Sequence, residues 1–482
     1  MVLLCSNAWR LLGWRKRALN AAFIAMAAVS LLHYLHLPPF YELENRPVNV
    51  HDLTHYYLGA KYFPELGYDR LYQCFIEATG NDFGAVYLRD LHDRQVKPLV
   101  NALDTDGGGC RPKFSDERWS DFVSDVRTVR PWAPADDWKR FVQDSGFNAP
   151  PTWLVAGYWL TNTVKLSLGS IYVLTTVDVA LLVLGLAALA ASFGCVATMS
   201  AIIGLTTLSV ATETWTIGSI LRWDWLFFLM LSLAAVRRNW MMASGVAFGL
   251  SASLRIFPIA ALAVIGLYAV LQYRSNRSLR PISSWAGGFV LGSAGLAAIS
   301  LLIFHAANWV AFFENIARHS MAYSVNYMGL RTFLTLAWSL QHSGTWFPSE
   351  SFLAFVKPES YSSIAWIHLA VAMTSLALLR RLGRQPPWVA MLAALAWIPF
   401  GWMELSSYYY MFWGCLFLVV EWSPVAAVPI AAGNAASWAI KYGLGESPHM
   451  YAATSAILCI AVILAYLVMD RTGSEMASDG PG

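Results

Sequence analysis

Asn49-Val-His-Asp-Leu-Thr-His-Tyr-Tyr-Leu-Gly-Ala-Lys-Tyr-Phe-Pro64 follows the first hydrophobic segment, and the rest of the chain is arranged around it. Apolar residues recur at i, i+3, i+4 and i+7, which predicts a short helix that ends near Pro64 and Gly67; they are Leu53, Tyr56, Tyr57 and Ala60. Asp52 lies where this helix begins, beside His51 and one turn before His55. Its carboxylate is either only the N-cap of the helix or a reactive group exposed at a membrane surface.

The composition limits the class of protein. Of the 482 residues, 57% are hydrophobic and 13% are charged, and the mean hydropathy is +0.47. Soluble multi-domain proteins carry more charge, so the sequence indicates a polytopic membrane protein. The net charge of +3 is too small to suggest a nucleic-acid partner, and the arginines are scattered between apolar runs.

The apolar runs predict an all-α fold with about twelve membrane crossings. They lie near residues 18–37, 170–193, 196–213, 219–236, 240–254, 256–272, 284–305, 362–379, 387–402, 406–421, 424–440 and 450–469. Basic residues at the N-terminus and between the runs predict that both termini are cytoplasmic. The later basic residues are Arg237 and Arg238; Arg274, Arg277 and Arg280; Arg380, Arg381 and Arg384; and Arg471.

Six parts follow from this topology. They are a cytoplasmic N-terminus with the first transmembrane helix (1–37), a large extracytoplasmic loop (38–168), transmembrane helices 2–7 (169–305), a second extracytoplasmic loop with interfacial helices (306–361), transmembrane helices 8–12 (362–469) and a cytoplasmic tail (470–482). In the first loop, Ser115 and Asp136 open two predicted amphipathic helices. Such helices suit either the lipid headgroup layer or a packed soluble core.

Cys74 and Cys110 lie in the first loop, where an oxidising compartment would allow a disulfide. The sequence does not favour either the bridged or the free form. The other cysteines are single residues in or near apolar runs. Their spacing does not indicate zinc, and we expect neither a metal nor a cofactor. Asp104-Thr-Asp106 has the form of an acidic metal-binding pair, but the three glycines after it favour a flexible turn.

Four segments, in their order along the chain, resemble GT-C-type membrane glycosyltransferases. They are Asp52-X-X-X-Tyr-Tyr with Gly67-Tyr-Asp-Arg-Leu-Tyr72, Asn148-Ala-Pro-Pro-Thr-Trp153, the glycine-rich stretch from Ala243 to Pro258, and Ser406-Ser-Tyr-Tyr-Tyr-Met. Over residues 20–420 the chain is most similar to the GT87 group, which includes polyprenyl-phosphate-mannose-dependent mannosyltransferases. It departs from that group at Arg255, where lysine is more usual, and in lacking a histidine in the last motif.

The resemblance implies an enzyme that moves a hexose or pentose from a polyprenyl-phosphate donor to a lipid or glycan acceptor, with inversion. The reaction is expected at the extracytoplasmic face of the inner (plasma) membrane. The resemblance also implies that Asp52 is the base that takes the proton of the acceptor hydroxyl. The sequence lacks the glycine-rich strand–turn–helix motif of a nucleotide site, which agrees with a lipid-borne donor.

Arg255 is always charged and is predicted to lie at an outer helix end, so it either binds the donor phosphate or snorkels to the interface. His319 resembles a donor-phosphate histidine of related enzymes, or is an ordinary interfacial residue. The expected substrate cavity contains His51, His55, Tyr56, Glu404, Tyr408 and Tyr409. The tyrosines also suit an interfacial aromatic belt.

Two other classes of protein remain open. A polyprenyl-linked polysaccharide polymerase or ligase would share the crossings and the large outer loop. A transporter would share the hydropathy profile, and its site is expected near the membrane midplane, where Asp178 is the plausible ionisable candidate.

Overall fold

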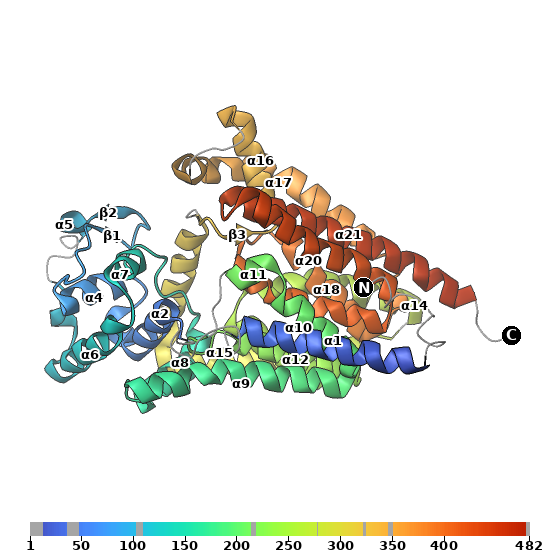
Figure 1. Cartoon of the computed structure of the whole chain (residues 1–482), viewed down its shortest axis with the longest axis horizontal. Helices are drawn as coiled ribbons and strands as arrows, with labels where there is room; N and C mark the ends of the chain where they lie inside the picture. The colour runs from blue at the N-terminus through green and yellow to red at the C-terminus, as the bar shows by residue number, and fades with distance from the viewer. Residues whose placement is uncertain are drawn as a thin grey trace.

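The computed structural model describes residues 13–35, 48–102, 109–213, 218–276, 278–321, 324–345 and 350–478. Helices account for most of this length, and the strands form two short antiparallel pairs. Figure 1 shows a smaller globular part, formed mainly by the segment after the first helix, beside a bundle of longer helices. The predominantly helical fold predicted from the sequence is therefore confirmed. The Asp104–Asp106 stretch lies outside the described residues.

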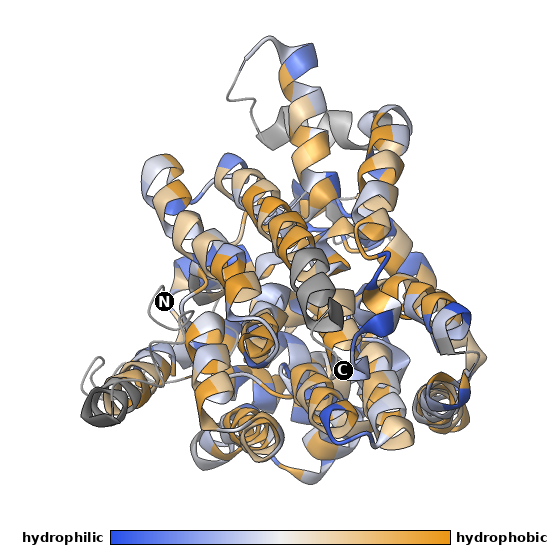
Figure 2. Cartoon of the chain, turned by 90° about the vertical axis from the view of Figure 1, so that its right-hand side faces the viewer, coloured by the Kyte–Doolittle hydropathy of each residue, from blue (hydrophilic) through white to orange (hydrophobic). Residues whose placement is uncertain are grey.

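Five helices in the described part of the chain are long and apolar enough to cross a membrane. They are Gly169–Phe193, Phe257–Ser275, Arg280–Met321, Ser360–Arg384 and Pro448–Met469. Hydrophobic residues predominate along the bundle helices, and hydrophilic residues gather at their connections (Figure 2). These features agree with a membrane protein. The number of crossings stays a prediction, because other apolar runs form helices shorter than the roughly 20 residues that span a bilayer.

The first half of the bundle contains α1 (Gly13–Tyr34), α9 (Leu168–Phe193), α10 (Cys195–Thr206), α11 (Ser209–Glu213), α12 (Asp224–Arg237), α13 (Met241–Leu254), η5 (Phe257–Ala261), α14 (Leu262–Asn276) and α15 (Arg280–Met321). The second half contains β3 (Tyr327–Met328), α16 (Leu330–Ser343), α17 (Glu350–Ala377), η6 (Leu382–Arg384), α18 (Pro387–Ala396), η7 (Ile398–Phe400), β4 (Leu405–Ser406), η8 (Ser407–Phe412), α19 (Trp413–Leu416), η9 (Phe417–Glu421), α20 (Pro424–Leu444) and α21 (Pro448–Ser478). Strands β3 and β4 pair antiparallel, with Tyr327 opposite Ser406.

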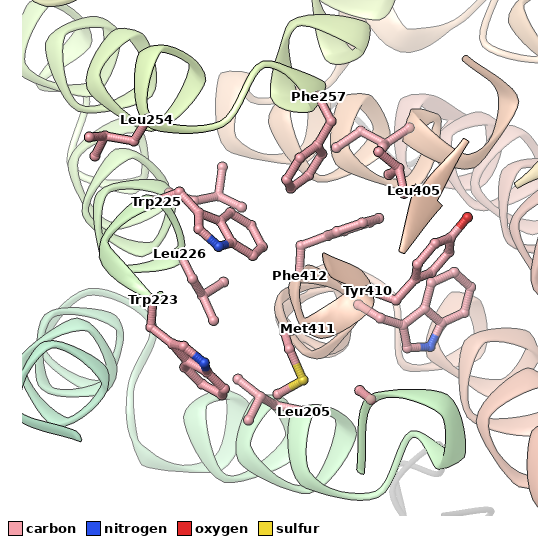
Figure 3. Packing of buried hydrophobic residues seen from close by; sticks show 14 of the residues in the cluster. Leu205, Trp223, Trp225, Leu226, Leu254, Phe257, Leu405, Tyr410, Met411 and Phe412 are labelled. Carbon is pink, nitrogen blue, oxygen red and sulfur yellow. The ribbon is translucent and has the colours of Figure 1, made fainter. Parts of the chain in front are cut away.

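The apolar run at 406–421 forms a succession of 3₁₀ and α turns, η8, α19 and η9, instead of one regular α-helix. Most of its side chains, including all from Tyr410 to Val419, are buried by neighbouring elements. Tyr410, Met411 and Phe412 point into the packed interior that Figure 3 shows. Irregular backbone is tolerated at membrane depth where protein encloses it. The hydrophobicity of this run therefore reflects enclosure by protein more than contact with lipid.

The segment predicted as a second loop, 306–361, is largely helical. Helix α15 continues to Met321 across a break at His305, whose φ of 60° and ψ of 163° are not helical. Helix α16 includes the short apolar stretch from Thr332 to Leu340, and α17 begins at Glu350, before the predicted end of the loop. The helices expected in this segment are present, and its position outside the cytoplasm stays a prediction.

Two of the predicted cytoplasmic segments, the one with Arg237 and the η6 turn with Arg384, lie near the helices α18 and α14, respectively. The Arg237 guanidinium lies 4.9 Å from the centre of the Trp388 ring, at the start of α18. Gly383, among the arginines of η6, packs closely against Leu271 near the end of α14. Helix α13 begins after Arg237 and ends just before Arg255. The length of this helix separates the two arginines by about 20 Å along the helix axis. Arg255 therefore lies toward the opposite end of the bundle.

Glycines allow α13 and α15 to approach backbone to backbone. A Cβ atom at Gly245 would collide with the backbone of Trp285, and one at Gly288 would collide with the backbone of Met242. This close contact fixes the direction of α13. The position of Arg255 at its end follows from that direction.

The globular part contains α2 (Val50–Lys61), α3 (Phe63–Leu66), α4 (Leu71–Thr79), β1 (Tyr87–Arg89), β2 (Val96–Pro98), α5 (Leu99–Ala102), η3 (Arg111–Lys113), α6 (Asp116–Val129), η4 (Arg130–Trp132), α7 (Ala135–Phe141) and α8 (Pro151–Thr163). Phe122 of α6 and Trp138 and Phe141 of α7 are fully buried, and Phe75 of α4 stacks on Trp138 at 5.0 Å. The amphipathic patterns of α6 and α7 thus arise from packing on a buried protein core.

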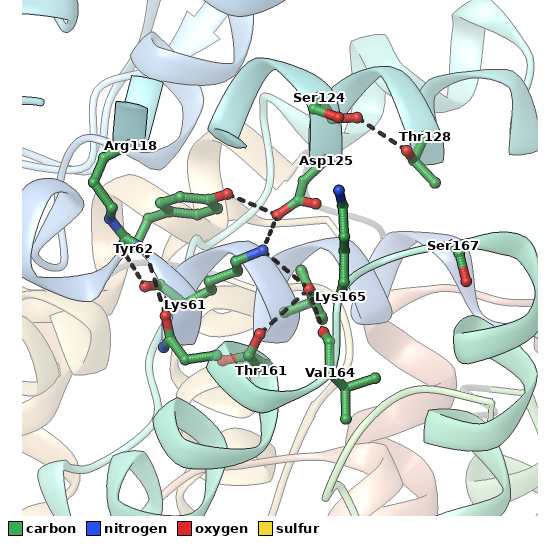
Figure 4. A network of polar contacts seen from close by, with 12 residues as sticks. Lys61, Tyr62, Arg118, Ser124, Asp125, Thr128, Thr161, Val164, Lys165 and Ser167 are labelled. Carbon is green, nitrogen blue, oxygen red and sulfur yellow. Dashed lines mark hydrogen bonds and ion pairs between the residues drawn. The ribbon is translucent and has the colours of Figure 1, made fainter. Parts of the chain in front are cut away.

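Helix α2 lies at the centre of this part and is buried from Leu53 to Lys61. Lys61 Nζ donates to Asp125 Oδ2 of α6 at 2.6 Å, and the Tyr62 hydroxyl donates to the same oxygen at 2.7 Å (Figure 4). Tyr57 donates to the Val164 carbonyl, beyond α8, at 2.9 Å. Buried charges are costly unless they are paired and hydrogen-bonded, so this satisfied network fixes α2 between α6 and α8.

Cys74 of α4 and Cys110 form a disulfide, which decides between the two forms left open by the sequence. The Glu77 carboxylate accepts the backbone N–H groups of Cys110 at 2.6 Å and Arg111 at 3.1 Å. The bridge and these bonds tie the chain before η3 to α4.

Replacing Cys74 and Cys110 by serine is expected to lower the free energy of unfolding by roughly 3–4 kcal/mol in the chain-entropy model, because the bridge closes a loop across a sequence separation of 36. Thermal unfolding of the full chain, matured in an oxidising compartment and followed by circular dichroism, measures the difference. Cys195→Ser is the control, because that thiol is free and exposed. Two free thiols in the wild-type protein would contradict the bridge.

Candidate active site

Asp52 and Arg222 form an ion pair that joins the globular part to the bundle. Arg222 Nε donates to Asp52 Oδ2 at 2.8 Å. The Arg222 side chain is 3% exposed and the Asp52 side chain is 18% exposed. The same guanidinium donates to the Tyr56 hydroxyl and lies 4.2 Å from the Tyr56 ring and 5.0 Å from the Tyr408 ring. Asp52, Tyr56 and Tyr408, three of the residues predicted for the site, are therefore brought together around an arginine that was not predicted.

Asp52 is not the N-cap of its helix. Asn49 holds that position, and its side-chain oxygen accepts the backbone N–H of Asp52 at 3.0 Å. Both Asn and Asp are strong N-cap residues, so the local sequence did not distinguish between them. Asp52 instead lies in the first helical turn, and its Oδ2 accepts the hydrogen bond from Arg222. Its other oxygen, Oδ1, accepts no hydrogen bond from any described residue. That oxygen is available to accept a proton or a hydroxyl.

The backbone that carries Arg222 is held by Asp178. The Asp178 carboxylate, fully buried in α9, accepts the backbone N–H groups of Arg222 at 2.9 and 3.0 Å and of Trp223 at 3.0 Å. The Asn49 backbone N–H donates to the Gly218 carbonyl at 2.8 Å, which ties the start of α2 to the same segment. Asp178, a candidate for a transport pathway, thus has a structural role that positions Arg222.

Arg255 is a buried cation without a carboxylate at ion-pair distance in the described part of the chain. Its side chain donates to the carbonyls of Leu254 at 2.6 Å and Leu221 at 3.5 Å, and Nε has no hydrogen-bond partner there. The residue is only 5% exposed, and its guanidinium lies 5.7 Å from the Tyr56 ring. A snorkelling arginine keeps its charged group in water. Burial therefore argues against that interpretation and leaves a positive charge that an anion would neutralise.

Aromatic rings form the side of the site next to η8. The rings of Tyr408 and Tyr409 are 4.6 Å apart, and Tyr409 lies 5.0 Å from Phe257. Phe257 in turn packs against Trp225 at 4.9 Å in the cluster of Figure 3. Both tyrosines are partly buried among these residues, next to the Asp52–Arg222 pair.

His51 and His55 lie on the other side of Asp52. His51 Nε2 is 2.8 Å from Asp144 Oδ2, and His55 lies in hydrogen-bond contact with the His51 carbonyl through Nδ1 at 3.1 Å and with the Tyr72 hydroxyl through Nε2 at 2.8 Å. Burial, reinforced by the charge of His51, lowers the pKa of His55 to about 3, which keeps its ring neutral at physiological pH.

His319 and Glu404 belong to a separate cluster beside the β3–β4 pair. His319 Nε2 is 2.9 Å from the Tyr327 hydroxyl, and Glu404 accepts a hydrogen bond from the Tyr361 hydroxyl at 3.3 Å. The Tyr361 ring lies 3.4 Å from the Arg331 guanidinium. These contacts place both residues, which were predicted for the site of Asp52, beside the β3–β4 pair.

Arg222 and Asp144 were not predicted from the sequence. Arg222 stands at the predicted outer end of the 219–236 run, where the positive-inside rule expects few arginines, and that departure was a usable signal. Asp144 gives no comparable signal, because it lies 93 residues from His51 in the sequence.

No family model matches this chain, and no curated protein or solved structure is significantly similar to it.

Proposed function

We propose that this chain is an inverting glycosyltransferase that moves a sugar from a polyprenyl-phosphate donor to a lipid or glycan acceptor. The observation that carries the proposal is the buried Arg255, which lacks a carboxylate partner in the described chain and lies beside the Asp52–Arg222 pair. A site that combines a partly exposed carboxylate with a buried cation that forms no ion pair among the described residues suits a reaction in which a proton leaves one group as negative charge develops on another.

The residues divide the reaction between them. The acceptor oxygen bonds to the anomeric carbon as the bond from that carbon to the phosphate oxygen breaks, and the acceptor proton passes to Asp52. The leaving polyprenyl phosphate gains negative charge, which Arg255 stabilises. Because this charge grows toward the transition state, Arg255 binds the transition state more tightly than the ground state. Arg222 holds Asp52 in place and adds a second positive charge.

The arrangement of charges supports an extracytoplasmic site in a multi-pass inner membrane protein. Arg237, one of the predicted cytoplasmic arginines, lies before the start of α13, whereas Arg255 lies at the end of that helix. The positive-inside rule then places the Asp52 site outside. The Cys74–Cys110 bridge fits an oxidising compartment on that side.

The proposal is tested with purified full-length protein, a panel of radiolabelled polyprenyl-phosphate sugars and a total lipid extract. A labelled product formed from one of these donors, with release of polyprenyl phosphate, is the expected result. Activity only on a lipid-diphosphate oligosaccharide would identify a polymerase or ligase instead. Solute counterflow in liposomes without any transfer would identify a transporter.

Arg255→Ala is expected to weaken apparent donor affinity by roughly 10- to 100-fold, because a charge-assisted contact contributes about 1.5–3 kcal/mol. Donor titration of the transfer rate measures the effect. Arg255→Lys keeps the charge without the planar fork and should lose less. Arg238→Ala, at the opposite end of α13, is the matched control. Equal donor affinity together with an equal maximal transfer rate in the Arg255→Ala and wild-type proteins would return Arg255 to a structural role.

A further inference from the structure

His51, His55 and Asp144 bring three metal-ligating side chains to one place. The two histidines lie one turn apart on α2, with ring centres 4.8 Å apart, and Asp144 approaches from the segment that follows α7. Each residue offers one ligand atom, and these atoms all lie within 4.8 Å of one another. Phe141 packs against both imidazoles, at 5.4 and 4.4 Å, and so fixes their orientation.

Two imidazoles and one carboxylate are a ligand set that zinc and other divalent first-row metals use, and histidines at i and i+4 of a helix are one way of presenting it. Ligands of one tetrahedral ion lie roughly 3.3 Å apart, so these atoms need to close by only about 1–1.5 Å. His51 and Asp144 are 38% and 48% exposed, which leaves room for that movement, for entry of the ion and for bound water.

The hydrogen bonds of His55 suit this role. The contact of Nδ1 with the His51 carbonyl assigns the ring proton to Nδ1, which leaves the lone pair on Nε2. The Tyr72 hydroxyl, which accepts the Gly146 backbone N–H at 2.6 Å, donates to that lone pair. A metal ion at Nε2 has to displace this one donor, so Tyr72 and the ion compete for the same atom.

We propose that His51, His55 and Asp144 bind one divalent transition-metal ion, for which zinc is the probe. The ion would clamp the first turn of α2 to the segment after α7. Asp52 is not one of the ligands, because its carboxylate is directed to Arg222. The site therefore does not depend on the proposed transferase reaction, and its test uses binding alone.

The experiment uses full-length protein that is purified without a histidine tag, stripped with a chelator and titrated with ZnCl₂ in a calorimeter. The expected result for wild type is about one ion per chain, as required by three converging ligands. His51→Ala and Asp144→Ala alter the exposed ligands, and each should weaken zinc binding by at least the roughly 10- to 100-fold that loss of an outer-shell group costs. His92→Ala, an exposed histidine of the same part, is the matched control and should bind as wild type does.

Tyr72→Phe separates the metal site from a plain hydrogen-bond network. It removes the hydroxyl that competes for His55 Nε2, so zinc should bind more tightly than in wild type. If the three side chains form only a hydrogen-bond network, the substitution should not increase zinc affinity. Absence of stoichiometric zinc binding in wild type, or equal binding by His51→Ala, Asp144→Ala and wild type, overturns the proposal. Either result leaves the proposed transferase function untouched.

Discussion

Asp52→Asn protein is expected to transfer sugar about 10²- to 10⁴-fold more slowly than wild type, because an amide keeps the shape of the side chain but cannot take the acceptor proton. The structure sharpens this prediction. Asn49, not Asp52, caps α2, so the substitution leaves the cap intact. The amide oxygen can still accept the hydrogen bond from Arg222 Nε, which limits the structural disturbance.

The transfer rate is measured on Asp52→Asn protein that elutes as a single species and unfolds at the wild-type temperature. Glu404→Gln is the matched control, because Glu404 is another carboxylate predicted for the substrate cavity and bonds to Tyr361 instead of Arg222. His51→Ala tests whether the adjacent imidazole shares the role of the base. Near-normal turnover by the Asn protein would remove Asp52 as the base. Loss in Asp52→Asn together with retention in the other two variants would assign the proton transfer to Asp52.

The local sequence predicted elements well where one periodicity decided the outcome. The i, i+3, i+4, i+7 pattern after Asn49 gave helix α2, and its end near Pro64 agrees with the short turn α3 that follows. The local pattern was less informative about whether a helix face packs against protein or against the membrane. The amphipathic faces of α6 and α7 suited a membrane surface or a core equally, and only the tertiary contacts of Trp138 and Phe141 identify the core. The hydropathy of 406–421 likewise does not distinguish enclosure from lipid contact.

The candidate site was predicted in part. Asp52 and Tyr56 lie on one helical face, so their proximity follows from the sequence. Their meeting with Tyr408 and Arg255 depends on tertiary structure, as does the pairing of Asp52 with Arg222 across 170 residues. A positively charged residue was expected to bind the phosphate. The sequence around Asp52, however, does not indicate which arginine forms an ion pair with it. His319 and Glu404 show the same limit, because their outer-loop position did not specify which cluster they join.

Arg222→Met protein is expected to lose up to about 3–5 kcal/mol of stability, since it leaves Asp52, which is 18% exposed, without the buried cation that compensates it. Asp52 would lose its only ion-pair partner among the described residues, and Tyr56 would lose a donor. The backbone bonds from residues 222 and 223 to Asp178 do not involve the substituted side chain, so the segment itself should keep its path. Denaturation of the full chain in detergent measures the change.

The control is Arg130→Met, which breaks an ion pair with Asp82 of similar length, 2.9 Å, but with the carboxylate 51% exposed. An exposed pair contributes only about 0–1 kcal/mol, so the two variants should differ clearly. The double variant Asp52→Asn/Arg222→Met completes a cycle. If the pair is coupled, the double variant should be more stable than the sum of the single losses predicts, by about 0.5–3 kcal/mol. Strict additivity, or equal losses in Arg222→Met and Arg130→Met, would mean that solvent already compensates Asp52. Arg222 would then not be what holds the base in place, and the positive charge of the site would rest on Arg255.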